Sequence, residues 1–432
     1  MVIVVGGGPA GATAARTLAK AGVPVRLLDR SSFPRNKPCG GGISLRVLKR
    51  FPYLNGELDR ISTHRVARLH LEGPDGEAAL IESDGAAALM IRRVEFDALL
   101  VSLAADAGAE VVSGADIVRA TQTSEAVLLE ARDGRRFEAP VVIAADGVHS
   151  VVARRLGLNP GWAAGAVALD MMEETPRDRL RDVDPSTLWV AYGYQPRRRG
   201  GGGATTDARG AERSAPEGYA YIFPKVDHVN VGIGYVLDHY RKSVDIAPYE
   251  LQRHFVDDLR RREIVVGESV RQHFTPFIIP VGGPLPAPGA GRVLLAGDAG
   301  GFVNGFTAEG IYYAMVSGDL AAGAVIQGAS GAALSTLASR YRRACDREVG
   351  EELRDSVLIQ RYLFADRRRI SDVIRAAREK SPLTDLILAF AVGRLGYRAL
   401  RRQMIARRPL LAARLAWARL RHGRVARPLA AN

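Results

Sequence analysis

The residues best suited to chemistry stand near the start of the chain, where Gly6, Gly8 and Gly11 follow the spacing G-x-G-x-x-G. An apolar run at residues 2–5 precedes the glycines, and a helix-like stretch at 12–21 follows them. Gly6 permits a tight turn, Gly8 lets the backbone approach a pyrophosphate, and Gly11 lets the helix pack closely on the strand. The helix N-terminus adds free N–H groups and partial positive charge. This combination predicts a dinucleotide-binding strand–helix–strand unit.

Acidic residues end three of the predicted buried strands. Asp29 closes the strand at 23–28, where a carboxylate accepts hydrogen bonds from ribose hydroxyls. Asp146-Gly147 and Gly297-Asp298 close two later strands. A second acid that is followed by small residues and a helix can bind ribityl hydroxyls, so the set favours FAD over NAD. We find no second glycine motif of this kind for NAD(P)H.

The three motifs together resemble those of flavoprotein monooxygenases and their relatives, which have the fold of p-hydroxybenzoate hydroxylase. Two further segments narrow the resemblance to the geranylgeranyl reductase family. Residues 33–43 (FPRNKPCGGGI) resemble the family's Lys-Pro-Cys-Gly-Gly loop, and residues 302–315 (FVNGFTAEGIYYAM) resemble its Asn-Pro-Phe-Thr-Gly-Glu-Gly-Ile stretch. Also similar are Arg93-x-x-Phe96-Asp97, Tyr219-x-Tyr221-x-Phe223-Pro224-Lys225 and residues 276–283 (PFIIPVGG). The resemblance extends over roughly residues 1–330.

The resemblance implies two groups of site residues. The FAD contacts would be Gly6, Gly8, Ala10, Gly11, Asp29, Arg30, Lys37, Cys39, Gly40, Gly42, Arg93, Asp298, Gly310 and Ile311. The substrate cavity would be lined by Tyr219, Tyr221 and Phe223. Cys39 is the catalytic candidate, because a thiol beside the flavin can gate the cavity or help to supply a proton. We expect no metal site, since no metal-ligand spacing is visible.

The sequence departs from the family's pattern at three positions. Gly305 stands where the family usually has Pro, and Ala308 replaces a Gly. Both changes are expected to loosen or reshape the loop on the flavin side. Tyr221 replaces a Trp in the substrate cavity, so the particular substrate stays open.

Composition excludes several classes of protein. The chain has 432 residues, of which 47% are hydrophobic and 25% charged, as in an ordinary globular protein. Its two cysteines, Cys39 and Cys345, stand too far apart in sequence for a disulfide framework or a zinc site built from cysteine pairs. No apolar run reaches the ~18 residues of a spanning helix. The N-terminus reads as a strand rather than a signal peptide, so we expect a cytoplasmic location.

The predicted fold is an α/β, Rossmann-like FAD-binding domain with an antiparallel-sheet substrate domain and a helical C-terminal region. We expect the FAD-binding domain to be discontinuous, formed by residues 1–60, 92–160 and 285–330. The substrate-binding sheet domain would comprise 61–91 and 161–284, and the helical region 331–432. A glycine- and arginine-rich segment at 196–217 is expected to be an inserted surface hairpin, for which a lid role has weak support.

The positive charge is concentrated at the C-terminal end. The chain carries a net charge of +13, whereas residues 361–432 alone carry eighteen basic and four acidic side chains, so the rest is close to neutral. Residues 386–432 contain eleven Arg and no acid. Such a segment suits an anionic membrane surface, where each Arg contributes about 1 kcal/mol. A solvated helical face is the alternative. We expect no nucleic-acid partner, because no recognition motif accompanies the charge.

The sequence therefore predicts an FAD-dependent reductase that saturates carbon–carbon double bonds of a prenyl (geranylgeranyl-type) chain carried on a lipid, a quinone or a diphosphate. An external electron donor, NAD(P)H or a ferredoxin, is expected, as is peripheral membrane association. One alternative is an FAD-dependent monooxygenase or halogenase on the same fold. Another is a non-catalytic protein that binds flavin and prenyl lipid. Fold analogy does not decide between them.

Overall fold

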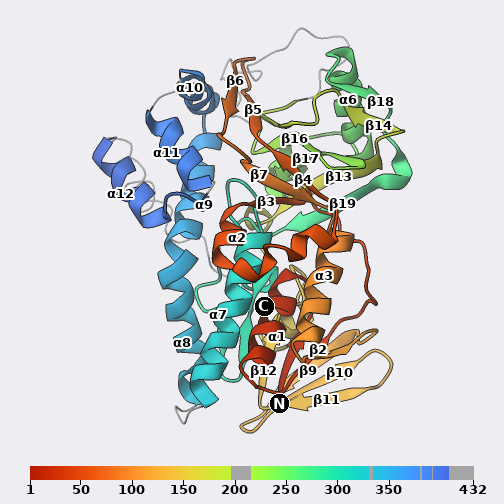
Figure 1. Ribbon diagram of the computed structural model, residues 1–432, viewed down its shortest axis with the longest axis vertical. Helices are drawn as coiled ribbons and strands as arrows, with labels where there is room; N and C mark the ends of the chain where they lie inside the picture. Colours follow the sequence, from red (N-terminus) through yellow and green to blue (C-terminus); the bar gives the residue numbers. More distant parts are fainter. Residues whose placement is uncertain (196–215, 330–333, 380–381, 392, 408–432) are drawn as a thin grey trace.

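The computed structural model describes residues 1–195, 216–329, 334–379, 382–391 and 393–407. Its lower half in Figure 1 is built on a six-stranded sheet. All neighbouring strands in this sheet run parallel, except for the antiparallel pair at the β20 edge. The strands, in spatial order, are β20 (Gly289–Ala290), β21 (Val293–Leu295), β12 (Val141–Ala144), β1 (Val2–Val5), β2 (Val25–Leu28) and β8 (Glu110–Val112).

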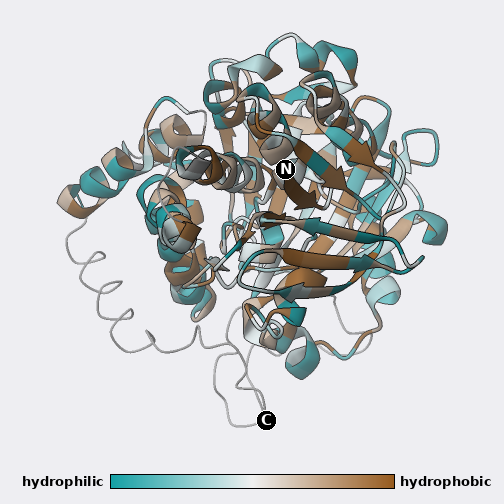
Figure 2. Ribbon diagram, turned by 90° about the horizontal axis from the view of Figure 1, so that it is seen from below, coloured by the Kyte–Doolittle hydropathy of each residue, from teal (hydrophilic) through white to brown (hydrophobic). Residues whose placement is uncertain are grey.

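Both faces of this sheet are covered, which explains why its central strands are continuous apolar runs. Side chains of one face, such as Val4 and Leu27, pack against α1 (Pro9–Lys20), α3 (Arg93–Asp106) and α7 (Ile311–Ala329). The other face packs against α4 (Val151–Arg155) and a three-stranded sheet of β9 (Ile117–Gln122), β10 (Val127–Ala131) and β11 (Arg136–Ala139). Figure 2 shows the strands in brown inside the molecule.

The upper half contains a seven-stranded sheet. Helix α6 (Pro248–Arg261) covers one of its faces, and the other face is turned toward the glycine motifs. The strands, in spatial order, are β19 (Phe274–Ile279), β13 (Ala168–Pro176), β17 (His228–Val236), β16 (Gly218–Pro224), β15 (Thr187–Tyr192), β5 (Arg68–Glu72) and β6 (Ala78–Glu82).

The sheet is largely antiparallel, as predicted, with one parallel pair that sequence reasoning did not anticipate. More than a hundred residues separate β5 from β15 in the chain, so no tight hairpin constrains their direction and a parallel pair can form. Smaller sheets join β3 (Gly42–Ser44), β7 (Ala88–Ile91) and β4 (Thr63–Val66), and β14 (Leu180–Asp182) with β18 (Val265–Gly267).

The predicted helical C-terminal region is confirmed; it runs along the left side of Figure 1. Its α9–α10 part packs on the β6 edge of the seven-stranded sheet. The helices are α8 (Leu337–Cys345), α9 (Glu351–Phe364), α10 (Arg367–Arg378), α11 (Pro382–Ala391) and α12 (Tyr397–Arg407). None of the helices within the described residues is long and apolar enough to cross a bilayer.

The remaining helices are short: α2 (Arg46–Arg50), α5 (Leu237–Ser243), the 3-10 turns η1 (Pro52–Leu54), η2 (Glu57–Arg60), η3 (Ala164–Ala166), η4 (Arg271–His273), η5 (Gly297–Gly300) and η6 (Leu334–Thr336), and the π turn η7 (Asp346–Gly350). The proposed division of the chain into three parts stays a prediction. Nearly all of the predicted insertion at 196–217 lies outside the described residues.

Candidate active site

The glycine turn requires glycine for steric reasons at two positions. Gly6 has a φ of +100°, and a Cβ there would lie 2.3 Å from the carbonyl oxygen of Ala145. A Cβ on Gly11 would lie 1.8 Å from the carbonyl oxygen of Gly6. Gly8 is the N-cap of α1, and among the described residues no side chain caps this helix end and no acid stands in its first turn. The N–H groups of the helix end are therefore available to an anion.

Two arginines converge on this helix end. A Cβ on Gly8 would lie 3.9 Å from Nη2 of Arg35 and 4.0 Å from Nη2 of Arg93. Asp97 holds both: its carboxylate accepts two hydrogen bonds from Arg93, at 2.6 and 2.7 Å, and pairs with Arg35 Nη1 at 3.1 Å. Two guanidinium groups share one carboxylate, so positive charge is left over beside Gly8. A helix end with uncapped N–H groups and excess positive charge fits the pyrophosphate of FAD.

Asp29 lies at the end of β2, buried beside the glycine turn. One carboxylate oxygen accepts the Gly7 N–H at 2.6 Å, and the other accepts the Ser31 N–H at 2.8 Å. A carboxylate has about four lone-pair sites, so Asp29 can still accept from ribose hydroxyls. The predicted role is compatible with this geometry, which also gives Asp29 a second task in fixing the turn. Arg30, in contrast, is exposed.

The Gly297-Asp298 motif lies against α1. A Cβ on Gly297 would lie 3.0 Å from the Cβ of Ala10 in α1. Asp298, in η5, is partly buried, with Oδ1 3.8 Å from the place of a Cβ on Gly310. Ile311 begins α7 directly after Gly310. The fold thus brings the first and last predicted cofactor motifs together although about 290 residues separate them.

The loop at 33–43 crosses from the glycine turn to the seven-stranded sheet. Cys39 is partly buried, its sulfur accepts the Gly41 N–H at 3.4 Å, and its carbonyl oxygen accepts from Asn230 of β17 at 3.3 Å. A Cβ on Gly40 would lie 2.7 Å from the ring of Phe223. Burial and the charge of Arg93 lower the pKa of Lys37.

An aromatic wall faces this loop. Tyr219, Tyr221 and Phe223 share one face of β16, because alternate residues of a strand point to the same side. Their rings follow one another, with centroids 6.1 Å and 4.5 Å apart. Tyr192 of β15 continues the wall from Tyr219 at 5.7 Å. The apolar residues around it are buried Met172 and Val190 and partly buried Leu69, Leu71 and Leu188. The three predicted substrate residues therefore lie in one apolar surface.

The loop at 304–310 closes one end of the wall. The ring of Phe306 stacks on Tyr192 with centroids 5.5 Å apart, and the Tyr219 hydroxyl donates to the carbonyl of Thr307 at 2.6 Å. The departures noted in the sequence have structural effects here. Ala308 has a φ of +55°, a left-handed conformation that favours glycine. The Gly305 N–H donates to Ser356 at 2.8 Å, a bond that proline would lack.

The sequence analysis did not identify some residues of the site, and for one residue the structure shows a role other than the one expected. Arg35 lies in a quoted motif without an assigned role, and Asp97 follows Arg93 by four helical positions, the spacing at which side chains meet on a helix. Asp170, 6% exposed, lies beside Tyr221 and had no sequence signal. Asp146, expected to be part of the FAD motifs, caps α4 by accepting N–H bonds from its first turn at 2.8 and 3.2 Å.

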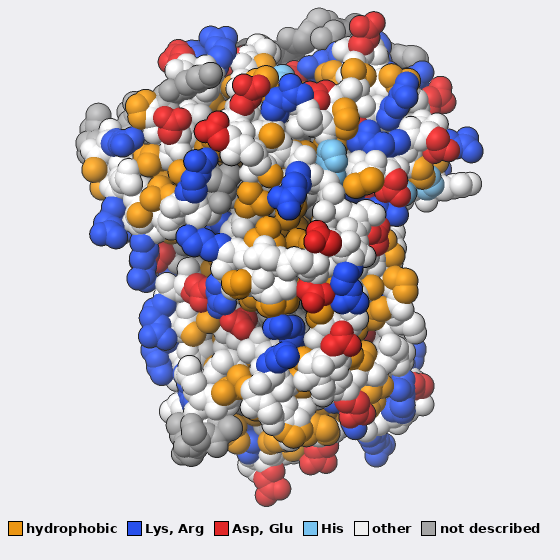
Figure 3. Space-filling view, viewed as in Figure 1, with side chains coloured by type: hydrophobic (Ala, Val, Ile, Leu, Met, Phe, Trp, Pro, Cys, Tyr) orange, Lys and Arg blue, Asp and Glu red, His pale blue; other side chains and the backbone are white. Residues whose placement is uncertain are grey.

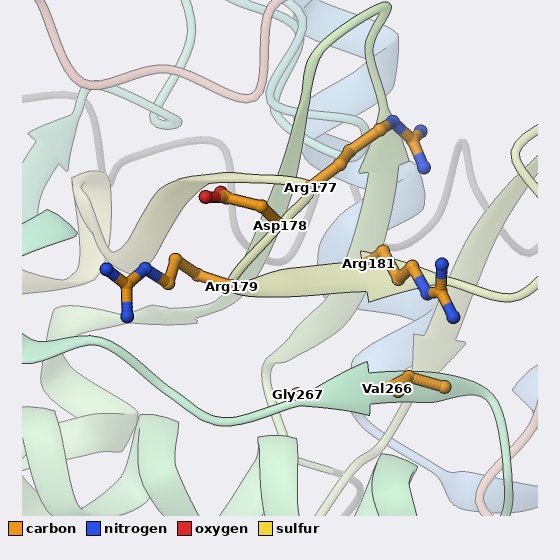
Figure 4. A pocket seen from close by; sticks show the side chains of 6 residues that line it. All are labelled: Arg177, Asp178, Arg179, Arg181, Val266 and Gly267. Carbon is orange, nitrogen blue, oxygen red and sulfur yellow. The ribbon is translucent and has the colours of Figure 1, made fainter.

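A separate cavity of about 320 Å³ opens at β14 and β18. Figure 4 shows that the side chain of Arg179 points to the opposite side from those of Arg177 and Arg181. Arg177 is also engaged, since it donates to the Lys225 carbonyl at 3.0 Å and to Asp182 at 2.5 Å. We assign no ligand to this cavity, because its charged groups do not converge.

Comparisons with known proteins identify the family of the chain. The FAD binding domain family matches residues 1–223. A chloroplastic geranylgeranyl diphosphate reductase from Oryza sativa subsp. japonica is 32% identical over 362 residues, which are 79% of this chain and 70% of that protein. The chain belongs to the geranylgeranyl reductase family of FAD-dependent oxidoreductases. A menaquinone reductase from Mycolicibacterium smegmatis is 32% identical over 333 residues, with 74% of this chain and 75% of that protein covered.

The fold of the geranylgeranyl reductase family is likewise confirmed. A geranylgeranyl bacteriochlorophyll reductase-like structure from Thermoplasma acidophilum superposes with a TM-score of 0.76 at 20% identity. The superposition covers 96% of this chain and 98% of that one. The likeness therefore includes the helical C-terminal region as well as the two sheets.

Proposed function

We propose that this FAD-dependent oxidoreductase saturates isolated double bonds of a prenyl chain. The observation that carries the proposal is the apolar, aromatic face of the seven-stranded sheet, which lies directly against the Cys39–Gly40 loop of the cofactor site. A surface of this kind suits a long hydrocarbon chain. The names of related proteins, which include reductases of geranylgeranyl diphosphate and of a digeranylgeranylglycerophospholipid, support the same substrate class.

Bound FAD supplies a hydride once it has been reduced. The residues of the chain hold and surround it: the α1 N-terminus with Arg35 and Arg93 binds the pyrophosphate, Asp29 the ribose, and Asp298 the ribityl chain. The Cys39–Gly42 loop keeps the cofactor next to the aromatic wall. Because an isolated alkene is a poor hydride acceptor, the wall must orient the chain and exclude water. Cys39 stays the candidate for contact with both cofactor and substrate.

We also propose that an external donor, NAD(P)H or a ferredoxin, reduces the flavin, and that the C-terminal region contacts an anionic membrane. In support of membrane contact, Ile387 of α11 and Ile405 of α12 are exposed large apolar side chains. Figure 3 shows hydrophobic side chains among arginines in this part of the surface.

Some arginines of the predicted basic segment at 386–432 form ion pairs within the protein. Arg401 pairs with Asp355 of α9 at 2.9 Å, and Arg398 lies 3.6 Å from Glu351. The Tyr397 hydroxyl donates to Asp355 at 2.7 Å. α12 is therefore anchored to α9, and residues 408–432 lie outside the described residues.

The deciding experiment is anaerobic. The protein is loaded with FAD, reduced with dithionite, and mixed separately with geranylgeranyl diphosphate, a digeranylgeranyl glycerophospholipid and menaquinone. We expect mass spectrometry to show products heavier by two hydrogens for each bond reduced. Oxygen-dependent NAD(P)H consumption with a hydroxylated or halogenated product would instead favour a monooxygenase or halogenase. Tight binding of FAD and prenyl lipid without turnover would favour a binding protein.

A further inference from the structure

We propose that Asp170 and Tyr221 form the proton relay of the reduction, with the Tyr221 hydroxyl as the group that meets the alkene and Asp170 as the residue that resupplies it. The inference rests on the proposed function, because it assigns the second half of the same reaction. A hydride alone does not saturate a double bond: the neighbouring carbon also needs a proton.

The two side chains meet across three strands. The Tyr221 hydroxyl oxygen, from β16, lies 3.2 Å from both carboxylate oxygens of Asp170 on β13. β17 runs between these strands, and its residue opposite Tyr221 is Gly232. A Cβ on Gly232 would lie 2.5 Å from the Tyr221 hydroxyl. The missing side chain thus leaves a groove across the sheet in which the tyrosine ring reaches Asp170.

The pair lies on the site-facing side of the sheet. The ring of Tyr221 belongs to the aromatic wall, with Cε2 3.7 Å from the place of a Cβ on Gly40. Asp170 is in register with Phe277 of β19, and the Lys37 ammonium lies 4.1 Å from the centre of the Phe277 ring. Tyr221 therefore stands between the loop that carries Cys39 and a buried carboxyl that reaches the site through it.

Burial raises the pKa of Asp170 to about 7, against the opposing effects of the Tyr221 hydrogen bond and the Lys37 charge. The ionisable groups that interact with it are Lys37, Tyr221 and Tyr219. Burial also raises the pKa of Tyr221, and Asp170 adds to the effect, so the hydroxyl keeps its proton. Near neutral pH Asp170 therefore holds a transferable proton next to a neutral phenol.

Together with the reduced flavin, the relay supplies every electron and proton that the reduction of one double bond needs. The π bond of the alkene breaks, and one carbon takes a hydride with its electron pair from the reduced flavin, which is thereby oxidised. The neighbouring carbon takes the proton of the Tyr221 hydroxyl. The carboxyl proton of Asp170 passes to the Tyr221 oxygen, and the resulting carboxylate faces the Lys37 ammonium. Asp170 then regains a proton from solvent.

The strand itself offers a matched control. Glu173, three residues along β13, points to the opposite face, is fully buried, and also has its pKa raised to about 7 by burial. It is held by Ser269 on the far side from the site. A Glu173→Gln variant thus removes a similar buried carboxyl from the same strand without touching the relay. Tyr235→Phe is the corresponding control for Tyr221, since its hydroxyl bonds the Tyr194 carbonyl at 2.6 Å on that same opposite face.

The test measures single-turnover oxidation of the reduced flavin by geranylgeranyl diphosphate, without oxygen, from pH 5.5 to 9. For the wild type, Glu173→Gln and Tyr235→Phe we expect the rate to fall about tenfold per pH unit above pH 7. For Asp170→Asn and Tyr221→Phe we expect rates roughly 10²- to 10⁴-fold lower at pH 6.5, with the fall above pH 7 lost in Asp170→Asn. Asp170→Glu should recover part of the rate. A normal flavin spectrum identifies the folded variants.

A second readout needs no turnover. In the Glu173→Gln background, infrared titration should show protonated carboxyls that ionise near pH 7, because burial raises the pKa of Glu309 to about 7 as well. Adding Asp170→Asn should remove one of these signals and leave that of Glu309. Unchanged rates and pH dependence in both relay variants would overturn the inference while leaving the proposed function intact, as would a Glu173→Gln variant as slow as Asp170→Asn. A wild type that reduces none of the prenyl probes would overturn the proposed function, and the relay with it.

Discussion

Arg30 and Arg35 allow a direct test of how the cofactor is held. The family resemblance implies that Arg30 contacts FAD, whereas the structure leaves Arg30 exposed and puts the Arg35 guanidinium 3.9 Å from the Cβ position of Gly8. We therefore expect Arg35→Gln to weaken FAD binding strongly and Arg30→Gln to change it little. The two variants remove the same charge and introduce the same side chain.

The size of the expected change in FAD affinity follows from the surroundings of each arginine. The Arg35 side chain is 18% exposed, so its hydrogen bond to a phosphate oxygen would be charge-assisted and largely shielded, worth about 1.5–3 kcal/mol. This corresponds to a roughly 10- to 150-fold increase in Kd. The fold should survive, because Asp97 keeps both of its hydrogen bonds to Arg93. For exposed Arg30, solvent screening limits the expected change to less than about 3-fold.

The assay is a titration of the apoprotein with FAD at fixed ionic strength, followed by the change in flavin fluorescence. Circular dichroism of each apoprotein checks that the fold is retained. Wild-type affinity in Arg35→Gln would show that this guanidinium does not reach the pyrophosphate. An equal loss in Arg30→Gln would show that the end of β2 contributes more than its exposure suggests. Either result would refute the reasoning.

Three further predictions concern stability. Ala308→Gly should raise the free energy of unfolding by about 0.5–1 kcal/mol, since relief of the left-handed strain exceeds the added chain entropy; a lower melting temperature would contradict this. Glu352→Gln should cost about 3–5 kcal/mol in denaturant unfolding, because it leaves the charge of largely buried Arg46 without its carboxylate partner and keeps one acceptor oxygen for the two hydrogen bonds at 2.7 and 2.9 Å, whereas Glu348→Gln, at a more exposed pair, should cost about 0–1 kcal/mol. Equal losses of stability in the two variants would show that burial does not strengthen the Arg46–Glu352 pair. Glu173 keeps its proton on folding up to a pKa of about 7, while the unfolded chain loses it near 4.5, so wild-type stability falls with rising pH over that range. Glu173→Gln should remove the part of this fall that Glu173 causes, leaving the part due to Asp170, and should gain up to about 3 kcal/mol at pH 8, measured from melts at pH 5 and pH 8. An equal pH dependence in both proteins would exclude the effect.

What the sequence could predict was mainly local. The spacing of Gly6, Gly8 and Gly11 specifies a strand–turn–helix unit within about ten residues, and Asp29 ends the next strand. The alternation of Tyr219, Tyr221 and Phe223 indicates a shared strand face in the same way. Each of these patterns depends on neighbours in the chain, so its geometry can be read from one segment.

The remaining parts of the site depend on tertiary register. Tyr221 meets Asp170 because three strands align with a glycine between them, and no pattern near either residue encodes that alignment. Arg35 reaches Gly8 through the path of an irregular loop. The end of a strand at Asp146-Gly147 was recognised, but the direction of the Asp146 side chain toward the α4 N-terminus depends on how the following turn folds.

The attachment of α12 to α9 determines where the chain can be shortened. A truncation before α11 would strip Asp355 of both Tyr397 and Arg401 and would leave a carboxylate on α9 without these partners. If such a protein no longer bound liposomes, the loss could come from the missing lipid contact or from a destabilised α9. Ending the chain after Arg407 keeps the contacts between α12 and α9. Comparing this truncation with the one before α11 therefore separates an effect on membrane binding from an effect on the stability of the C-terminal helices.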